Sequence, residues 1–141
     1  ASATAFTADE LIDLVYSLKA PYRKHALFLF NDQTLKAIRK LKDGNGQFLW
    51  QPGLQAGQPN TLLGYRYETS YHMPLIGAGA KPILFGDFSS YWIADREGRS
   101  IKRLNELYAA TGQIGFRVTQ RLDARLVQQE GMKCLAMKAG S

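Results

Sequence analysis

The stretch Ala26-Leu27-Phe28-Leu29-Phe30-Asn31-Asp32 passes from an uninterrupted apolar run to two polar residues. The apolar run is too short for a helix and predicts a strand that is buried on both faces. Asn31 or Asp32 suits the N-cap of a helix, which we expect to run to about Lys42 and to end at Gly44. The stretch therefore predicts a strand that leads directly into a helix, whose apolar residues are Leu35, Ile38 and Leu41.

A first helix is predicted upstream of this strand, over residues 8–19. Thr7 and Glu10 have the spacing of a capping box, in which each side chain bonds the backbone N–H of the other residue. Pro21 ends the helix, because the residue before a proline disfavours the helical conformation. One apolar stripe at helical spacing follows the cap and consists of Leu11, Leu14, Val15 and Leu18.

Downstream of residue 61 the pattern favours strands. A period of two in Tyr65, Tyr67, Thr69 and Tyr71 predicts a half-buried strand over residues 62–73. Gly115–Leu126 alternates between apolar residues and arginines, which predicts a long strand with one polar face. Shorter strands are expected at residues 83–87 and 91–94, and these two meet at Phe88-Ser89-Ser90. A turn at Arg96-Glu97-Gly98 leads to another short strand at residues 101–104, and a final strand is expected at residues 132–137.

The order of these elements indicates the fold class. The chain has 141 residues and is most simply one domain, and it contains no internal repeat. Two helices come early and strands fill the rest, which favours α+β over repeated βαβ units. We therefore expect a central sheet with two helices packed on one side of it.

Residues 43–65 fit no regular element. Five glycines and two prolines break the stretch, yet it carries Phe48, Trp50 and Leu54. A structureless loop of about 20 residues inside a compact domain is usually functional or disordered. Gly44-Asn45-Gly46 lacks the Gly-Lys-Ser/Thr ending of a phosphate-binding loop and follows a predicted helix instead of leading into one. The stretch must therefore pack on its own domain or meet a partner.

Composition excludes several classes of protein. No apolar run approaches the ~20 residues of a membrane span. Cys134 is the one cysteine, which excludes an internal disulfide and a zinc site built on cysteines, and its apolar context predicts a buried small side chain. The N-terminus has no signal-peptide pattern, and a start at Ala1 leads us to expect a fragment or a processed product.

Residue types that carry catalysis are present but scattered. His25 and His72 lie in dissimilar contexts far apart in the chain, and nothing nearby completes a metal or catalytic site. Asp87, Asp95 and Glu97 fall in predicted turns, where acidic residues are common for backbone reasons. We therefore expect no enzyme, no cofactor and no metal site.

The basic residues offer a more general lead. The formal net charge is +6, and seven of the 18 basic residues lie between positions 19 and 42. Such a face could bind nucleic-acid phosphates, or it could be a solvated helix surface, or it could meet carboxylates of a neighbouring subunit. The seven residues are Lys19, Arg23, Lys24, Lys36, Arg39, Lys40 and Lys42.

A series of motifs runs along nearly the whole chain. The most extensive is Leu35-Lys36-Ala37-Ile38-Arg39-Lys40-Leu41-Lys42-Asp43-Gly44-Asn45-Gly46-Gln47-Phe48-Leu49-Trp50-Gln51-Pro52. The other stretches are residues 11–18, 57–59, 62–65, 73–74, 85–88, 95–98 and 115–123. Together, and in the expected order, they resemble the C-terminal half of tailed-phage major capsid proteins of the Hong Kong 97 type.

This resemblance implies a structural role. Residues 1–141 would be a fragment that resembles the axial domain, and residues 114–128 a strand that belongs in part to a missing peripheral domain. The chain would self-associate with other copies into pentamers and hexamers that enclose phage DNA. A scaffold, a protease or a portal would be further partners of the full-length protein, with no membrane and with DNA only as the packaged genome. The location would be the virion capsid, and the host bacterial cytoplasm during assembly.

Subunit contacts are the functional sites that this interpretation predicts. The alternative function is a basic nucleic-acid-binding module that uses the same charged surface. The predicted contact residues are Phe48, Trp50 and Leu54 of the loop, Lys36, Arg39 and Lys40 of the second helix, and Arg117, Arg121 and Arg125 of the long strand.

Overall fold

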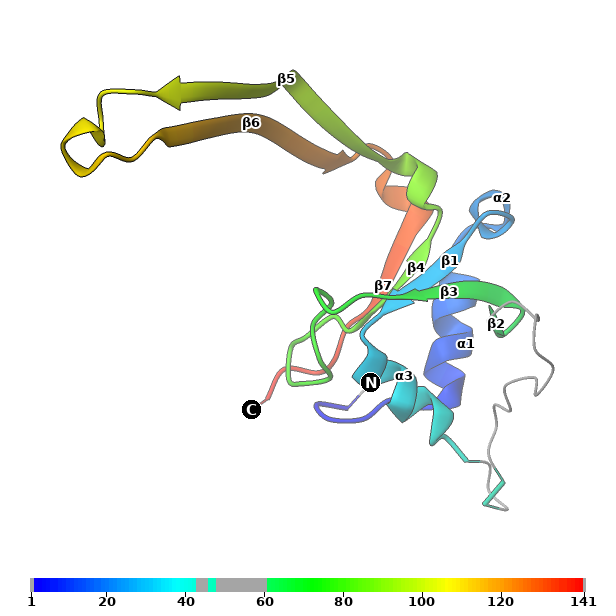
Figure 1. The fold of residues 1–141 in the computed structure, drawn as a ribbon. Coiled ribbons are helices and arrows are strands. Elements are labelled where there is room, and N and C mark those ends of the chain that lie inside the picture. The colour runs from blue at the N-terminus through cyan, green and yellow to red at the C-terminus, as the bar shows by residue number, and fades with distance from the viewer. Residues whose placement is uncertain (1, 43–45, 48–60, 141) are drawn as a thin grey trace, which may run out of the picture. The chain divides into compact units, whose positions relative to one another are not determined.

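A computed structural model describes residues 2–42, 46–47 and 61–140, which fall into two compact units (Figure 1). Unit 1 comprises residues 1–88 and 128–141, and unit 2 comprises residues 89–127.

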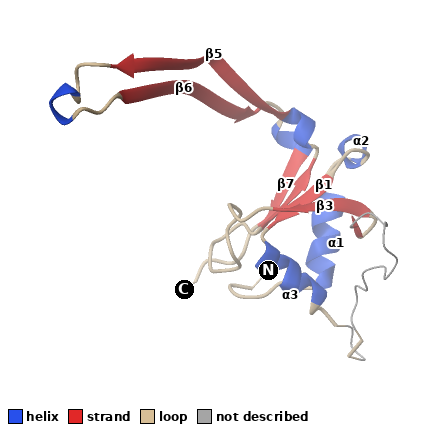
Figure 2. Ribbon diagram, viewed as in Figure 1, coloured by secondary structure: helices blue, strands red, loops and turns tan. Residues whose placement is uncertain are grey.

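The sheet of unit 1 is mixed, with β1 in its centre (Figure 2). The strand β1 pairs in parallel with β3 and antiparallel with β4, so Phe28 stands opposite Tyr67 on one side and Phe85 on the other. The remaining pairs, β2 with β3 and β4 with β7, are antiparallel. The strands are β1 (Leu27–Phe30), β2 (Thr61–Leu62), β3 (Tyr65–Thr69), β4 (Ile83–Gly86) and β7 (Met132–Leu135), in the order β2-β3-β1-β4-β7.

Both predicted helices are present in unit 1, as α1 (Ala8–Ser17) and α3 (Asp32–Arg39). The capping box is confirmed, because the Glu10 N–H donates to Thr7 Oγ1 and the Thr7 N–H donates to the Glu10 carboxylate. The first helix is shorter than predicted, because the chain becomes extended at its C-cap and then forms the single turn α2 (Ala20–Arg23). Helix α3 likewise ends before Lys42.

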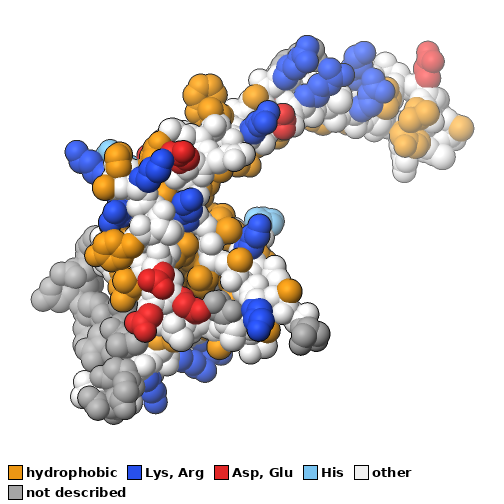
Figure 3. All heavy atoms as spheres, turned by 180° about the vertical axis from the view of Figure 1, so that it is seen from behind, with side chains coloured by type: hydrophobic (Ala, Val, Ile, Leu, Met, Phe, Trp, Pro, Cys, Tyr) orange, Lys and Arg blue, Asp and Glu red, His pale blue; other side chains and the backbone are white. Residues whose placement is uncertain are grey.

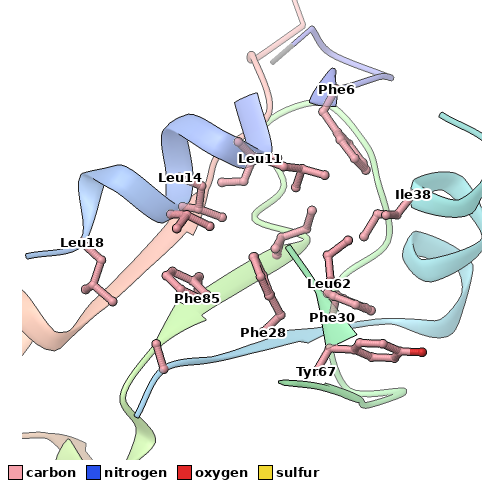
Figure 4. Close-up of a cluster of buried hydrophobic side chains, with 14 of the residues drawn as sticks. Phe6, Leu11, Leu14, Leu18, Phe28, Phe30, Ile38, Leu62, Tyr67 and Phe85 are labelled. Carbon is pink, nitrogen blue, oxygen red and sulfur yellow. The ribbon is translucent and has the colours of Figure 1, made fainter. Parts of the chain in front are cut away.

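One face of the sheet is covered by α1 and α3. Figure 4 shows side chains from both helices directed at the phenylalanines of β1 and β4. Leu27 and Leu29, on the opposite face of β1, are only half-buried. The expectation that β1 is buried on both faces is therefore wrong, because the helices cover one face. The core comprises Phe6, Leu11, Leu14, Val15, Leu18, Ala26, Phe28, Phe30, Ile38, Leu62, Tyr67, Ile83, Phe85, Leu135 and Met137.

The strand expected over residues 62–73 is broken in two. A two-residue turn at Leu63 and Gly64 joins β2 to β3, and both residues have positive φ angles, 52° and 82°. Such turns match the twist of a β-hairpin. Strand β3 ends at Thr69. Asn31 holds the segment that follows, because its side-chain amide donates to the backbone carbonyls of Tyr71 and Met73.

Unit 2 is a long antiparallel hairpin of β5 (Tyr91–Leu104) and β6 (Gly115–Leu126), with a short 3-10 helix at Ala109–Thr111 between them. The predicted limits of Gly115–Leu126 are confirmed. The predicted turn at residues 96–98 is wrong, because β5 continues through it with an irregularity in register between Arg96 and Ser100. Gly98 has a φ of 61°, which suits a β-bulge. The strands expected to meet at Phe88–Ser90 lie in different sheets.

Much of the loop over residues 43–65 lies outside the described residues. The predictions for Phe48, Trp50 and Leu54, including partial exposure of either aromatic side chain, fall in this part of the chain.

Candidate functional site

One face of the β5–β6 hairpin is apolar and exposed in the described chain. Phe116, Val118 and Leu122 lie on the same parity of β6, with exposed fractions of 60–67%. Ile101 stands opposite Val118, and because residues directly opposite in an antiparallel pair point to the same face, it extends this surface. A two-stranded ribbon buries too little surface to be stable alone, so this face is a candidate for contact with further protein.

Polar side chains interrupt the apolar face near the bulge. Gln120 Nε2 donates to Asp95 Oδ2 at 3.2 Å, and Arg99 Nε donates to Gln120 Oε1 at 3.3 Å. Through these two hydrogen bonds, Gln120 of β6 bonds Asp95 before the irregular segment of β5 and Arg99 near its end. The bulge is thereby fixed in register against the partner strand.

The other face of the hairpin carries the predicted arginines Arg117, Arg121 and Arg125, all exposed. The register places Lys102 opposite Arg117 and Arg96 opposite Arg121, so like charges face each other across the strands. Like charges at directly opposite positions destabilise a hairpin, and negative groups of a partner would relieve the repulsion. Four cations line a hollow of about 270 Å³ on this face, and Figure 3 shows Lys and Arg side chains gathered along the hairpin.

The sequence interpretation missed Arg96 and Lys102 as members of this face. The turn predicted at residues 96–98 placed them in different elements, although the two residues share one parity of β5 and three residues between Arg96 and Ser100 oppose a single residue of β6. Only the cross-strand register reveals which cations stand together.

The predicted residues of α3 lie on its exposed side. Thr34 and Ile38 are buried, whereas Lys36, Arg39 and the C-cap Lys40 are exposed. Lys36 and Lys40 are four residues apart, which places them together on one face. The structure thus groups three of the predicted contact residues on α3 in unit 1 and three on β6 in unit 2.

An ion pair of unit 1 marks the start of α2. Lys19 Nζ lies 2.6 Å from Glu130 Oε2, and both side chains are largely exposed. The hydrogen bond lowers the pKa of the Glu130 carboxyl and raises the pKa of the Lys19 ammonium. Both groups are therefore charged at neutral pH, and the pair is lost only when acid protonates Glu130 or strong base deprotonates Lys19. Beside it, the Gln128 amide donates to the Tyr22 hydroxyl.

The residue types considered for catalysis are not brought together. Among the described residues no group of three or more His, Cys, Asp or Glu side chains could hold a metal ion. His25 and His72 are exposed, and Cys134 is half-buried, so the expectation of a buried cysteine is wrong. It lies on the face of β7 that α1 does not cover. No helix in the described part of the chain is long and apolar enough to cross a membrane.

Comparison with known proteins identifies the family. The phage capsid family matches residues 1–137. The chain is similar to the capsid of an empty gene transfer agent (GTA) particle computed with C5 symmetry, with 37% identity, 98% of this chain and 48% of that chain covered, and a TM-score of 0.83. For the capsid of the native GTA particle computed with C5 symmetry the identity is 36%, the coverage is again 98% and 48%, and the TM-score is 0.85.

The chain spans about half the length of these solved capsid chains, and no curated protein matches it. The mixed sheet of unit 1, its helices on one face and the long hairpin all lie within the region of similarity. The chain therefore belongs to the phage capsid family and has the α+β capsid fold of the Hong Kong 97 type.

Proposed function

We propose that the protein is a structural subunit of a phage-type capsid shell and acts by self-association, without catalysis and without a cofactor. The observation that carries the proposal is the match of the phage capsid family to residues 1–137. Similarity to GTA capsids computed with C5 symmetry supports it, because cyclic symmetry requires repeated contacts between identical copies.

The proposed assembly consists of pentamers and hexamers that enclose phage DNA. Packing around such rings is heterologous, so one face of a subunit meets a different face of its neighbour. Each contact need only be modest, because many contacts act together in a closed shell. In this proposal a scaffold, a protease or a portal is a further partner. The protein is located in the host cytoplasm during assembly and in the virion capsid afterwards.

The hairpin of unit 2 belongs, in this proposal, in part to a peripheral domain, whereas unit 1 forms the axial domain. The exposed apolar face of the hairpin supports this assignment, because such a ribbon needs a further layer for stability. The solved capsid chains are about twice as long as this one, so they contain further protein that could supply that layer.

The subunit contacts include the exposed cations of α3 and of β6. Lys36, Arg39 and Lys40 on α3 and Arg117, Arg121 and Arg125 on β6 are accessible to carboxylates of a neighbour. Phe48, Trp50 and Leu54 are the apolar members of the proposed contacts.

Charge reversal on α3 tests this proposal. The protein at its natural length is expressed as wild type and as the Lys36→Glu/Arg39→Glu/Lys40→Glu variant, and particle yield is counted by electron microscopy. We expect wild-type shells and at least a tenfold lower yield for the variant, with unchanged circular dichroism. The Lys81→Glu/Lys138→Glu variant, which reverses two other exposed lysines of unit 1, is the control. Normal yield of the α3 variant would remove α3 from the contacts, and absence of wild-type particles would contradict the function.

A nucleic-acid-binding module is the second candidate function. The observation that favours it is the row of exposed cations on α3. Binding through phosphates weakens steeply as salt increases, so duplex DNA should bind at low salt and dissociate near physiological salt. No binding at low salt would remove this candidate.

A further inference from the structure

Unit 1 contains a basic hollow that no predicted contact includes. The hollow has a volume of about 580 Å³ and lies where α2 leads into β1, beside the turn that joins β2 to β3. We define the basic hollow by the four side chains Arg23, Lys24, His25 and Arg66, which line it together with apolar residues. No carboxylate from the described residues lines it, so none of these residues balances its positive charge within the hollow.

Arg23 in the hollow has a buried donor that is unsatisfied within the described residues. Its Nε is buried, and no hydrogen-bond acceptor for it lies among the described residues. The guanidinium lies over the ring of Tyr16, with 5.1 Å between Cζ and the ring centroid, so the ring helps to hold its position. A buried donor without an acceptor costs free energy, and a carboxylate in the hollow would be attracted by the positive charge of the guanidinium.

The surface beside the basic hollow is apolar. A second hollow of about 330 Å³ shares Arg23 and Tyr65 with the first and is also lined by Ile12, Tyr16 and Leu63. The last three side chains have exposed fractions of 40%, 70% and 47%. An apolar area next to a charged one is typical of protein–protein interfaces, where the apolar part is buried and the polar part forms the rim.

The same unit presents a complementary acidic surface. Asp9 and Asp13 are exposed and lie four residues apart on α1, so they are neighbours on one face of the helix, with their Cβ atoms about 6 Å apart. Figure 3 shows several acidic side chains of unit 1 gathered on one area of its surface. No ion pair of Asp9, Asp13, Lys24 or Arg66 occurs within the described chain, so these charges are available to a second copy.

We propose that the basic hollow of one copy binds the carboxylates of Asp9 and Asp13 of the next copy, in a contact that repeats around a capsomer. The inference rests on the proposed function, because it needs self-association. A heterologous contact joins two different surfaces, and the hollow and the acidic residues of α1 are different surfaces of opposite charge. Ile12, Tyr16 and Leu63 provide apolar area beside the charges.

Charge exchange between the two surfaces tests the contact. The hollow-reversed variant is Lys24→Glu/Arg66→Glu, and the acid-reversed variant is Asp9→Lys/Asp13→Lys; all four residues are exposed. Asp13→Lys alone is a second acid-side variant, because Asp9 lies in the first turn of α1 and its replacement can weaken the helix. Association of the protein at its natural length is measured by sedimentation velocity at low salt, with Lys81→Glu/Lys138→Glu as control.

Each reversed variant alone should associate about tenfold or more weakly than wild type, and the control should match wild type. An equimolar mixture of the two reversed variants should recover most of the association, because each then meets an oppositely charged neighbour. Normal association of either variant alone, or no recovery in the mixture, would overturn this contact while leaving the proposed function intact. If the mixture does not recover and wild type binds a duplex DNA probe through the hollow, the hollow is a nucleic-acid site instead. Failure of the wild type to associate would overturn the proposed function and this contact together.

Discussion

Gly86 shows how closely β4 and β7 approach each other. A Cβ atom at this position would collide with the carbonyl oxygen of Gly131 and would lie 2.7 Å from Met132 Cα. Both atoms belong to the backbone, so a side chain at residue 86 can be accommodated only if the strand pair shifts. The pairing of β4 with β7 therefore requires a glycine at residue 86.

We predict that Gly86→Ala lowers the free energy of unfolding by about 1–3 kcal/mol, as over-packing of a core does. Gly77→Ala is the matched control, because a Cβ at Gly77 meets no atom within 4 Å and should change stability by less than about 1 kcal/mol. Urea unfolding of both variants measures the difference. Equal stability of the two variants would show that the strands are further apart than described.

Leu63 is the one non-glycine residue with positive φ in the described chain. The left-handed conformation costs a leucine about 1–2 kcal/mol, whereas asparagine adopts it more readily and Asn-Gly is the preferred pair in such turns. We predict that Leu63→Asn raises the unfolding free energy by up to about 1 kcal/mol. Leu62→Asn, at the buried neighbouring position, should lower it. Destabilisation by Leu63→Asn would mean that the apolar contacts of Leu63 outweigh its strain.

Residue-level predictions from sequence succeeded where one local interaction decides the outcome. The sequence predicts Asn31 or Asp32 as a helix cap, and the cap is Asn31, whose side-chain oxygen accepts a hydrogen bond from the Gln33 N–H at 3.0 Å. The same reasoning could not find the positive φ of Leu63, because leucine gives no turn signal. It also assigned Cys134 to the buried set, since the sequence does not show which face of β7 the helices cover.

At the scale of elements, α1 is held at its start by reciprocal hydrogen bonds. The Glu10 N–H donates to Thr7 Oγ1 at 3.3 Å, and the Thr7 N–H donates to Glu10 Oε2 at 2.9 Å. We predict that Thr7→Ala lowers the unfolding free energy by about 1 kcal/mol, whereas Thr7→Ser, which keeps the hydroxyl, changes it by a few tenths. Chemical denaturation distinguishes them, and equal losses for both variants would show that the methyl group of Thr7, not its hydroxyl, matters.

None of the described side chains of β5 and β6 is buried, so the hairpin should open more easily than the sheet of unit 1. We predict that amides of β5 and β6 exchange hydrogen at least about tenfold faster than those of β1 and β4 in unassembled protein, and that assembly slows them. Hydrogen exchange followed by mass spectrometry measures both states. Equal protection of the two sheets before assembly would contradict the need for a partner layer.

The ends of some helices and strands could be predicted from the sequence, whereas the ends of others could not. The capping box gave the start of α1, and the regular alternation of Gly115–Leu126 gave β6. The continuous run of β5 through residues 96–98 was missed, because a glycine next to charged residues predicts a turn and a β-bulge equally well. Cross-strand pairs such as Lys102 and Arg117 depend on register, which a single sequence does not contain.

At the scale of the whole molecule, the order of motifs was more informative than any single residue. The resemblance to Hong Kong 97 type capsid proteins rested on short stretches spread over the chain, and the match of the phage capsid family over residues 1–137 agrees with it. The contact residues could not be predicted in the same way. A contact depends on complementary surfaces of two copies, and a single chain contains only one of the two surfaces. The contacts of Arg117, Arg121 and Arg125 thus stay predictions.

The central claim is that this chain folds as part of a shell-forming subunit. Electron cryo-microscopy of the protein expressed at its natural length, at a resolution that separates strands, tests it most directly. We predict closed shells in which the sheet of unit 1, with α1 and α3 on one face, repeats around five-fold axes. Well-folded protein that stays monomeric and forms no shells at any concentration would contradict the claim.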